Sequence, residues 1–439
     1  MRNQLWMLVV VFIFLLIPKS YAQVLPHSTK DWQLADIPPT LMQVKQDEAI
    51  FAPIVGEMKA VAELYAEHGF YLYSPAGDYR PMQFGNDYAY VNVDAISTQK
   101  PRLAPVDDRL NDLNNPIYDY LLTTQNTPVY RSAKESNQPI AMLFSNLRYP
   151  VLDRMIKTEK GGQKIAWLII RLGDRLGYIK LADVEMDKGI PILTYHHLLR
   201  NSENKKFQHT STTTSVEAFQ TQMNYLKQAG YQTLALEDIE GYLNKSVNLP
   251  AKSVVLTFDD GLKSVYRYAY PILKNNQQQA TLFVISSRVK TIPQKWSPDG
   301  LQFMSKQEIK SSQDVFHIQS HTHFLHKLDY RNSPILFSRK EHTIFLDFQR
   351  SMRILQKFEP NQRYLAYPFG GFNQTAMIAA KQAGLGLAVT TIQGKVHLGD
   401  NPFALKRLYA LKTDPIEKFA QMVGNSGDEI INQNIVVDR

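Results

Sequence analysis

The segment VVLTFDDG, residues 254–261, joins an apolar run of strand type to two adjacent carboxylates and a glycine. Uncharged runs of β-branched and aromatic residues are typical of strands that are buried on both faces. Asp259 and Asp260 follow directly, where such a strand would end. Two carboxylates this close favour a raised pKa in one of them or a bound cation. The segment therefore predicts a buried strand with a chemically active end, although a solvated turn would also explain these residues taken alone.

The rest of the C-terminal half repeats this pattern of buried strand and helix. Helices are expected over residues 264–273, 341–358 and 374–383, and one more is expected after a capping box of Thr214 and Glu217. Strand-like runs cover residues 192–195, 233–236, 254–258, 281–285, 315–318, 364–367 and 387–391. About seven strand–helix units over roughly 235 residues favour a parallel β/α barrel. In such barrels the chemistry lies at the carboxyl ends of the strands.

The N-terminal half has a different, tyrosine-rich pattern. After a helix-like segment at residues 60–68, β-like runs follow at residues 69–75, 87–96, 127–132, 167–170 and 177–184. The endings YVNVDAI (90–96) and YIKLADV (178–184) form a weak internal repeat. Short strands between turn residues predict small β-barrel modules. The second copy resembles the bacterial Src-homology-type barrel, which implies binding of cell-wall glycans or peptides; a packing module without a ligand is the alternative.

The N-terminus has the layout of an export signal. Arg2 precedes an unbroken apolar run at residues 5–17, and Ser20, Tyr21 and Ala22 end in a small-x-small pattern. This predicts a secretory signal cleaved after Ala22, and therefore a protein of the periplasm, the cell surface or the medium. An uncleaved anchor is the alternative. No later segment is apolar enough to span a bilayer, so no transmembrane helix is expected after signal removal.

The composition limits the kinds of site the chain can hold. The 439 residues include no cysteine and carry a net charge of +8. Disulfides and thiolate metal sites are excluded, so any metal must be held by His, Asp or Glu. No lysine- or arginine-rich run is present, so no nucleic-acid partner is expected.

Three further strand ends carry polar groups. His321, His323 and His326 follow one of them, and the five-residue spacing of the outer pair fits a loop that curls over a metal rather than a helix face. Imidazole and carboxylate together suit a divalent ion with positions left open for water and substrate. The turn YPFGG (367–371) can aim a backbone N–H into a cavity, as an oxyanion donor requires. His196 and His197 follow the fourth strand end, and one of them could be a general acid.

Taken together, these residues resemble the polysaccharide deacetylases, the NodB-homology family of carbohydrate esterases, over residues 190–422. The resemblance rests on TFDDG after an apolar strand and SHTxxxH about 60 residues later. It implies a distorted (β/α)7-type barrel and metal-dependent removal of acetyl groups from N-acetylated sugars. The predicted fold is therefore this barrel, preceded by the small β-barrel modules of the N-terminal half. The domain order then predicted is a signal (1–22), an N-terminal β-rich region (23–118), the Src-homology-type barrel (119–187), the deacetylase domain (188–425) and a tail (426–439).

The resemblance also implies roles for single residues. His323 stands at a variable position of the motif and receives no role. Many members carry an arginine two positions before the residue that matches Pro368; Ala366 stands there, and Arg407 is expected to replace that arginine beside the catalytic aspartate. The roles carried over are Asp259 as base, His196 as acid, Tyr367 as backbone oxyanion donor, and Asp260, His321 and His326 as metal ligands.

The implied function is a hydrolase that releases acetate from N-acetylglucosamine units of an extracellular or envelope polysaccharide. The histidine spacing and the N-terminal position of the acid motif match the branch that acts on poly-β-1,6-N-acetylglucosamine. Zinc is the expected metal, and cobalt, nickel or iron would fit the same ligands. The alternatives are a deacetylase of peptidoglycan or chitin, an esterase of acetylated xylan, and a non-catalytic glycan-binding envelope protein. Contact with the wall or envelope through the β-modules is a further expectation, with a packing role of these modules as its alternative.

Overall fold

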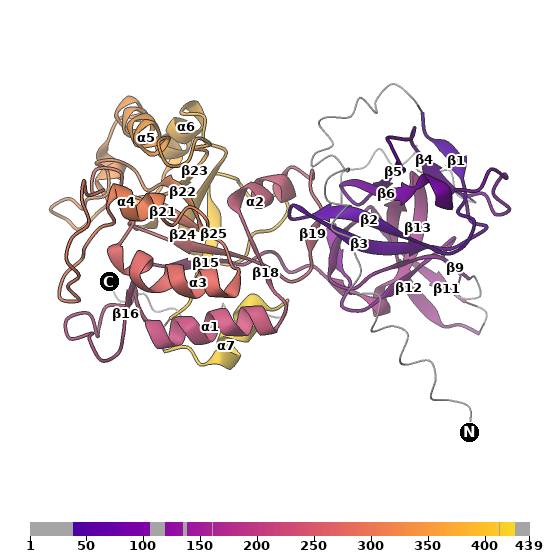
Figure 1. Ribbon diagram of the computed structural model, residues 1–439, viewed down its shortest axis with the longest axis horizontal. Helices are drawn as coiled ribbons and strands as arrows, with labels where there is room; N and C mark the ends of the chain where they lie inside the picture. Colours follow the sequence, from indigo (N-terminus) through magenta and orange to yellow (C-terminus); the bar gives the residue numbers. More distant parts are fainter. Residues whose placement is uncertain (1–37, 106–118, 135–137, 160, 412, 426–439) are drawn as a thin grey trace. The chain divides into compact units, whose positions relative to one another are not determined.

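The computed structural model describes residues 38–105, 119–134, 138–159, 161–411 and 413–425 (Figure 1). The predicted signal and the predicted tail lie outside these residues. The chain forms two compact units. The first ends at residue 184, and the second runs from residue 185 and also includes residues 119–122 and 146–148. Within the described residues, every helix is too short or too polar to cross a bilayer.

The second unit is built on a sheet of eight strands that are all parallel. In sheet order they are β15 (Ile192–Tyr195), β25 (Leu405–Tyr409), β24 (Leu387–Gln393), β23 (Tyr364–Ala366), β22 (Phe316–Ser320), β21 (Ala280–Val284), β20 (Ser253–Phe258) and β18 (Gln232–Leu234). Because β15 pairs with β20 as well as with β25, seven strands close into a ring and β18 adds an eighth on β20. The predicted (β/α)7-type barrel is confirmed.

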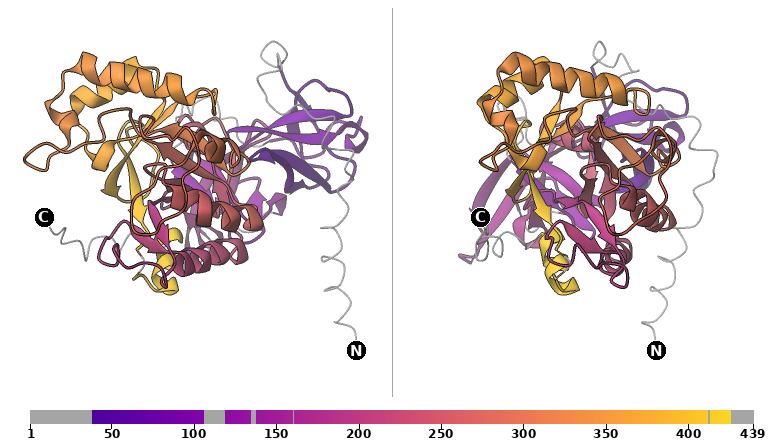
Figure 2. Two further views of the ribbon diagram at one scale, coloured as in Figure 1. Left: turned by 60° about the vertical axis from the view of Figure 1, so that its left-hand side comes forward. Right: turned by 90° about the vertical axis from the view of Figure 1, so that its left-hand side faces the viewer.

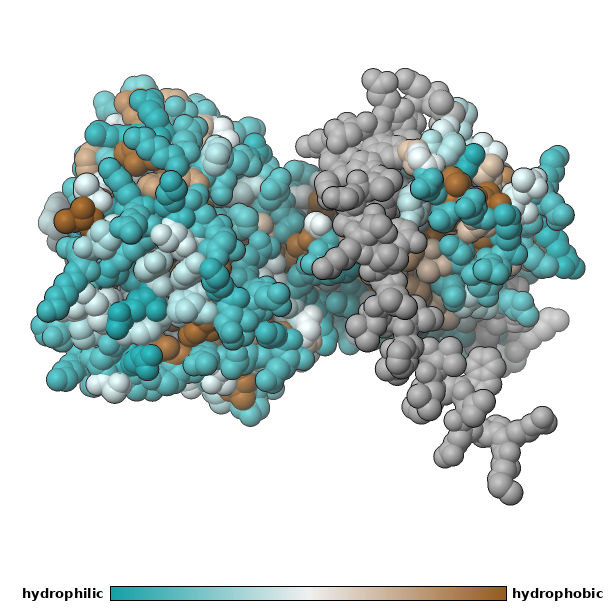
Figure 3. All heavy atoms as spheres, viewed as in Figure 1, coloured by the Kyte–Doolittle hydropathy of each residue, from teal (hydrophilic) through white to brown (hydrophobic). Residues whose placement is uncertain are grey.

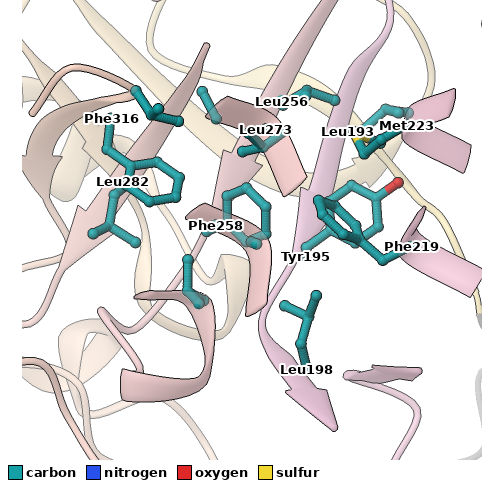
Figure 4. Close-up of a cluster of buried hydrophobic side chains, with 14 of the residues drawn as sticks. Leu193, Tyr195, Leu198, Phe219, Met223, Leu256, Phe258, Leu273, Leu282 and Phe316 are labelled. Atoms are coloured by element: carbon teal, nitrogen blue, oxygen red, sulfur yellow. The ribbon is translucent and has the colours of Figure 1, made fainter. Parts of the chain in front are cut away.

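The barrel strands are held by large apolar side chains between the sheet and its helices. Figure 4 shows part of this core, where the ring of Tyr195 stacks on Phe258 at 5.5 Å and meets Phe219 edge-on at 5.1 Å. All six residues of β20 are buried. This burial on both faces explains the uncharged run that precedes Asp259.

Helices cover the outside of the barrel (Figure 1). They are α1 (Val216–Gln228), α2 (Leu236–Leu243), α3 (Tyr270–Asn276), α4 (Lys306–Lys310), α5 (Glu341–Leu355), α6 (Gln374–Gln382) and α7 (Ile416–Val423). Figure 2 shows α5 and α6 side by side. The predicted capping box is wrong by one residue, because Ser215 rather than Thr214 accepts the hydrogen bond from the N–H of Ala218. The helix expected at residues 264–273 begins as a π-helical turn, Val265–Ala269, before α3.

Strand β25 was not among the strands expected from the sequence. Two charged residues, Lys406 and Arg407, stand next to each other between Leu405 and Leu408. The strand therefore lacks the uncharged pattern of the other barrel strands. Its position between β15 and β24 closes the barrel. Only folding into the barrel therefore brings the side chain of Arg407 within hydrogen-bonding distance of Thr257 and Asp259.

The first unit is an all-antiparallel barrel. Its strands are β2 (Glu48–Ile54), β3 (Glu57–Leu64), β5 (Tyr79–Phe84), β6 (Asp87–Asn92), β8 (Thr127–Tyr130), β9 (Pro139–Leu143), β11 (Asp153–Thr158), β12 (Lys164–Leu172) and β13 (Arg175–Lys180). They form one nine-stranded sheet that closes where Leu172 pairs with Phe84. The two segments predicted as modules, 23–118 and 119–187, thus share one sheet. The internal repeat has a structural counterpart, since β6 and β13 each lead into a single 3-10 turn.

The helix expected at residues 60–68 is wrong. Residues Glu57–Leu64 form β3, which pairs along its length with β2. Alanine, glutamate and leucine favour a helix locally, but pairing on both sides with β2 and β9 satisfies the backbone in the extended form. Shorter strands are found at β1 (Thr40–Met42), β4 (Phe70–Leu72), β7 (Asp119–Leu122), β10 (Leu147–Val151), β14 (Glu185–Met186), β16 (His197–Leu199), β17 (Thr213–Ser215) and β19 (Leu249–Pro250).

Candidate active site

The carboxyl ends of four barrel strands bring the predicted residues together. Asp259 follows β20 directly, and its carboxylate is buried. Arg407 of β25 donates two hydrogen bonds of 2.8 Å to it, from Nη1 to Oδ1 and from Nη2 to Oδ2. Arg407 is fully buried, and its Nε donates to the carbonyl of Thr390 at 2.8 Å while Nη1 also donates to Thr257 at 3.1 Å. The guanidinium is therefore held by Thr390, Thr257 and Asp259, and its two terminal nitrogens bind the two oxygens of the carboxylate.

The charge of Arg407 determines the state of Asp259. Burial by itself would raise the pKa of this carboxyl, but the charge and the hydrogen bonds of Arg407 outweigh it and hold the pKa well below its usual range. Asp259 is thus a carboxylate at neutral pH.

His196 also lies near Asp259. Its Nε2 is 3.7 Å from Oδ2 of the carboxylate. The imidazole stacks on the ring of Tyr409, with 6.2 Å between the centroids and 11° between the planes. Because the side chain of His196 stays 16% exposed, it can reach both the aspartate and a bound molecule.

Asp260, His321 and His326 form a group that could hold a metal ion. One ligand atom of each lies within 4.8 Å of the other two. Oδ1 of Asp260 is 3.2 Å from Nε2 of His326 and 3.6 Å from Nε2 of His321. That oxygen is buried and forms no hydrogen bond within the described part of the chain. A buried carboxylate oxygen between two imidazole nitrogens fits a divalent cation, which would supply the missing partner.

The state of His321 suits a ligand. Burial lowers the pKa of His321 to about 4, so its ring is neutral at pH 7 and Nε2 keeps a lone pair. Nδ1 lies 2.8 Å from the carbonyl oxygen of Ala366, to which it donates its proton. This bond fixes the tautomer and the ring orientation. Ala366 therefore supports the site through its backbone, at the position where many members of the resembled family carry an arginine.

Comparison with known proteins agrees with this geometry. A family model described as polysaccharide deacetylase matches residues 246–388. A poly-β-1,6-N-acetyl-D-glucosamine N-deacetylase of Staphylococcus aureus (strain MSSA476) is 30% identical over 210 residues, which are 47% of this chain and 70% of the relative. The chain belongs to the polysaccharide deacetylase family. The predictions of this family and of an enzyme of this class are confirmed.

Two solved structures are similar to about half of the chain. The Streptococcus pyogenes deacetylase PplD, solved in complex with acetate, is 27% identical with a TM-score of 0.47, over 54% of this chain and 99% of PplD. IcaB from Ammonifex degensii is 28% identical with a TM-score of 0.46, over 55% of this chain and 97% of IcaB. His196 and Arg407 lie outside the residues that the family model matches.

The N–H predicted as the oxyanion donor of this deacetylase is occupied in the structure. The backbone N–H of Tyr367 donates to the carbonyl of Val389 at 3.2 Å. The next N–H in the chain is that of Phe369, since Pro368 has none. Phe369 lies in the short turn Pro368–Gly370 after the end of β23 and has a left-handed backbone with φ 55°, so it is not part of the strand ladder. The turn therefore offers the N–H of Phe369, two residues after the predicted donor.

The deacetylase site is surrounded by strained backbone. Asp260, Thr322 and Phe369 have φ values of 73°, 68° and 55°. Side chains other than glycine seldom adopt this left-handed conformation, and each case costs about 1–3 kcal/mol unless the surroundings enforce it. All three residues follow the ends of β20, β22 and β23, so the strain is concentrated at the candidate site.

Two histidines near the motifs point elsewhere. Nδ1 of His197 lies 2.8 Å from Oγ of Ser264, and burial lowers the pKa of this histidine to about 4. Nδ1 of His323 lies 2.8 Å from Oγ of Ser286. Both side chains are buried and hydrogen-bonded to the scaffold. Of the pair at 196 and 197, only His196 faces Asp259.

Asp347 of α5 is a site residue that the sequence interpretation missed. Its carboxylate accepts the N–H of His323 at 2.8 Å and the N–H of Phe324 at 2.7 Å. It therefore holds the loop between His321 and His326. A signal was present, because Asp347 stands three residues after Ile344 and four before Ser351 on the buried face of the helix.

Proposed function

We propose that this chain is a metal-dependent N-deacetylase of poly-β-1,6-N-acetylglucosamine that releases acetate. The observation that carries the proposal is the pairing of two groups on adjacent residues. Asp260 joins His321 and His326 in a cluster of metal-ligand type, and Asp259 lies beside it, fixed by Arg407. The named substrate of the 30% identical relative favours this glycan among N-acetylated polymers.

The residues that would hold the cation are Asp260, His321 and His326. One carboxylate and two imidazoles leave coordination positions open, which is typical of catalytic rather than structural zinc sites. Zinc is therefore the proposed metal, with cobalt, nickel and iron accepted by the same ligands. A divalent ion in this place supplies Lewis acidity to the acetamide carbonyl and to water.

Asp259 acts as the general base in this proposal. Arg407 keeps it ionised and correctly oriented, and the same charge makes it a weak base. It can accept a proton only from water that has already been made more acidic, so the base and the cation site depend on each other. The proton leaves as water attacks the carbonyl carbon of the acetamide.

The remaining groups act on the two ends of the breaking bond. The N–H of Phe369 takes the oxyanion role predicted for Tyr367 and receives the developing charge on the carbonyl oxygen. His196 donates a proton to the departing sugar amine. Acetate and a glucosamine unit are the products, and atoms balance with the one water consumed.

The test is acetate release from oligomers of β-1,6-linked N-acetylglucosamine, with and without a chelator, followed by addition of Zn, Co or Ni. Release that the chelator stops and a metal restores supports the reaction, the metal and the glycan together. Release only from chitin or peptidoglycan fragments would support the proposed deacetylation but contradict the proposed substrate. No release from any acetylated glycan by protein that binds metal would contradict the proposal and favour a glycan-binding protein.

Location and envelope contact belong to the same proposal. A polymer outside the cytoplasm requires an exported enzyme, which the predicted signal at residues 1–22 would provide. The domain boundaries given above and a wall- or envelope-binding role for the antiparallel barrel remain predictions. Fractionation of cells, with immunodetection of the chain in periplasm, membrane and medium, tests the location.

A further inference from the structure

Among the described residues, the most exposed aromatic side chains belong to one part of the second unit, the parallel barrel. Surface residues are otherwise mainly hydrophilic on the face seen in Figure 3. The aromatic residues that are most exposed are Phe324 (50%), Tyr330 (86%), Phe337 (44%) and Phe369 (45%). All of them belong to the segments that follow β22 and β23. These segments also carry His321, His326 and the turn at Phe369, so the exposed rings accompany the candidate site.

Phe369 is fixed against a candidate metal ligand. Its ring centroid is 4.4 Å from that of His326. Its backbone has φ 55°, and the next residue, Gly370, packs so closely on Thr391 that a Cβ there would clash with Oγ1 of Thr391. The close fit of Gly370 leaves the turn little freedom. One side of the Phe369 ring therefore covers His326 while nearly half of its surface stays open to solvent.

Phe337 lies beside the same turn. A Cβ on Gly371 would be 3.0 Å from Cζ of Phe337 and 2.9 Å from Cγ of Pro334, so these side chains pack directly on Gly371. The loop that carries Phe337 is ordered by hydrogen bonds, among them Ile335 N–H to the carbonyl of Lys327 at 3.0 Å. Phe337 is thus an exposed ring held against Gly371, which lies two residues after Phe369 in the chain.

The other two exposed rings differ from this pair. The ring of Phe324 lies 4.1 Å from that of His323, with the guanidinium of Arg350 over it at 5.2 Å. The ring of Tyr330 has Arg331 over it at 5.0 Å. Cations already occupy faces of both rings. Phe337 and Phe369 have no such cation among the described contacts.

We propose that Phe337 and Phe369 form a binding platform for pyranose rings adjacent to the sugar that is deacetylated. This inference rests on the proposed function. A polysaccharide must continue past the reacting acetamide, and a sugar on the open side of Phe369 would be separated from His326 only by the ring of Phe369. The apolar C–H face of a pyranose packs on an aromatic face, which carries partial negative charge. The platform selects extended polymer over single sugars, because its contacts are made outside the reacting unit.

The experiment compares wild type with Phe337→Ala, Phe337→Tyr, Phe369→Leu and Phe369→Tyr. Leu346→Ala is the matched control, because Leu346 is an apolar side chain that is 51% exposed on α5, outside the segments that carry Phe337 and Phe369. The kcat and KM for acetate release are measured on the β-1,6-linked dimer, tetramer and hexamer. For the wild type, kcat/KM should rise with the length of the oligomer.

The platform predicts a rise in KM that grows with length. Phe337→Ala should raise KM for the hexamer about three- to tenfold with kcat within about twofold, which is the scale of one aromatic contact. Phe369→Leu should show the same length-dependent rise in KM, whatever its effect on kcat, because Phe369 is also the proposed oxyanion donor. Both Tyr variants should keep the length dependence because a flat ring remains. An unchanged length dependence in Phe337→Ala and Phe369→Leu would overturn the platform. So would equal effects on the dimer and the hexamer.

A binding assay separates this inference from the proposed function. Hexamer binding to metal-stripped protein is measured by calorimetry, which needs no turnover. Weaker binding by Phe337→Ala than by Leu346→Ala supports the platform even if no glycan is deacetylated. No binding to wild type, or equal binding, overturns it. Exposed rings beside basic residues also suit a membrane surface. Loss of pelleting with vesicles of phosphatidylglycerol, with oligomer kinetics unchanged, would assign the rings to a membrane instead.

Discussion

Arg407 and Asp259 stand 148 residues apart in the chain and meet through two parallel hydrogen bonds of 2.8 Å. Both side chains are buried, so each charge depends on the other. The arginine comes from the strand that closes the barrel, and the aspartate from the strand that begins the motif. This pair links the integrity of the barrel to the ionisation of the proposed base.

Arg407→Met should therefore destabilise the fold and remove activity. The substitution leaves a buried carboxylate without a partner, which costs about 3–5 kcal/mol. The free energy of unfolding, from urea titration, and acetate release measure the two effects. Arg363→Met is the matched control, because its pair with Glu240 is partly exposed and should contribute about 0–1 kcal/mol. Equal losses of stability in both variants would contradict the assignment.

Substitution of the two adjacent aspartates should distinguish the role of a general base from that of a metal ligand. Asp259→Asn should lower turnover by at least about 10²-fold and leave metal affinity within a few-fold of wild type. Asp260→Asn should lose metal affinity, because the group of three ligand atoms is then incomplete. Acetate release and competition with a chromophoric chelator give the two readings. Turnover that survives in Asp259→Asn would show that another group is the base.

The strands and motifs of the barrel could be predicted because their signals are local. Residues 254–258 are apolar since they are buried on both faces, and Asp259 follows because a strand end is where a polar group can face a cavity. The predicted cluster of Asp260, His321 and His326 likewise rests on short motifs. Strand β25 escaped because its central residues, Lys406 and Arg407, are charged.

The details of the site depend on contacts that sequence order does not contain. Asp347 reaches the histidine loop from a helix, and the N–H of Tyr367 is taken by Val389 from the next strand. The sequence predicted two separate β-rich modules, because the pattern of a strand does not reveal which other strands it pairs with. Pairing between β3 and β9 places both in one sheet, and the same pairing turned the expected helix at residues 60–68 into a strand.

His196→Ala should impair amide hydrolysis far more than ester hydrolysis. An amine leaves only after protonation, and loss of a general acid lowers the rate by about 10²–10⁴-fold. A phenolate leaves without that proton, so hydrolysis of p-nitrophenyl acetate should fall much less. Rates on a β-1,6-linked oligomer and on the ester are compared in one preparation. His209→Ala, at an exposed position of the loop after β16, is the control. Equal losses on both substrates would argue for a role other than acid.

Asp347→Asn should weaken the metal site without touching a ligand. The amide oxygen can still accept one N–H, but its NH₂ group faces the other donor, so the loop between His321 and His326 loses its anchor. Supports of this kind typically change metal affinity by about 10–100-fold. Metal affinity should fall on that scale, and turnover should return when metal is in excess. Asp314→Asn, at an ion pair on the surface, is the control and should leave both unchanged. If turnover stays low at saturating metal while the melting temperature drops, Asp347 supports the fold and does not position the ligands.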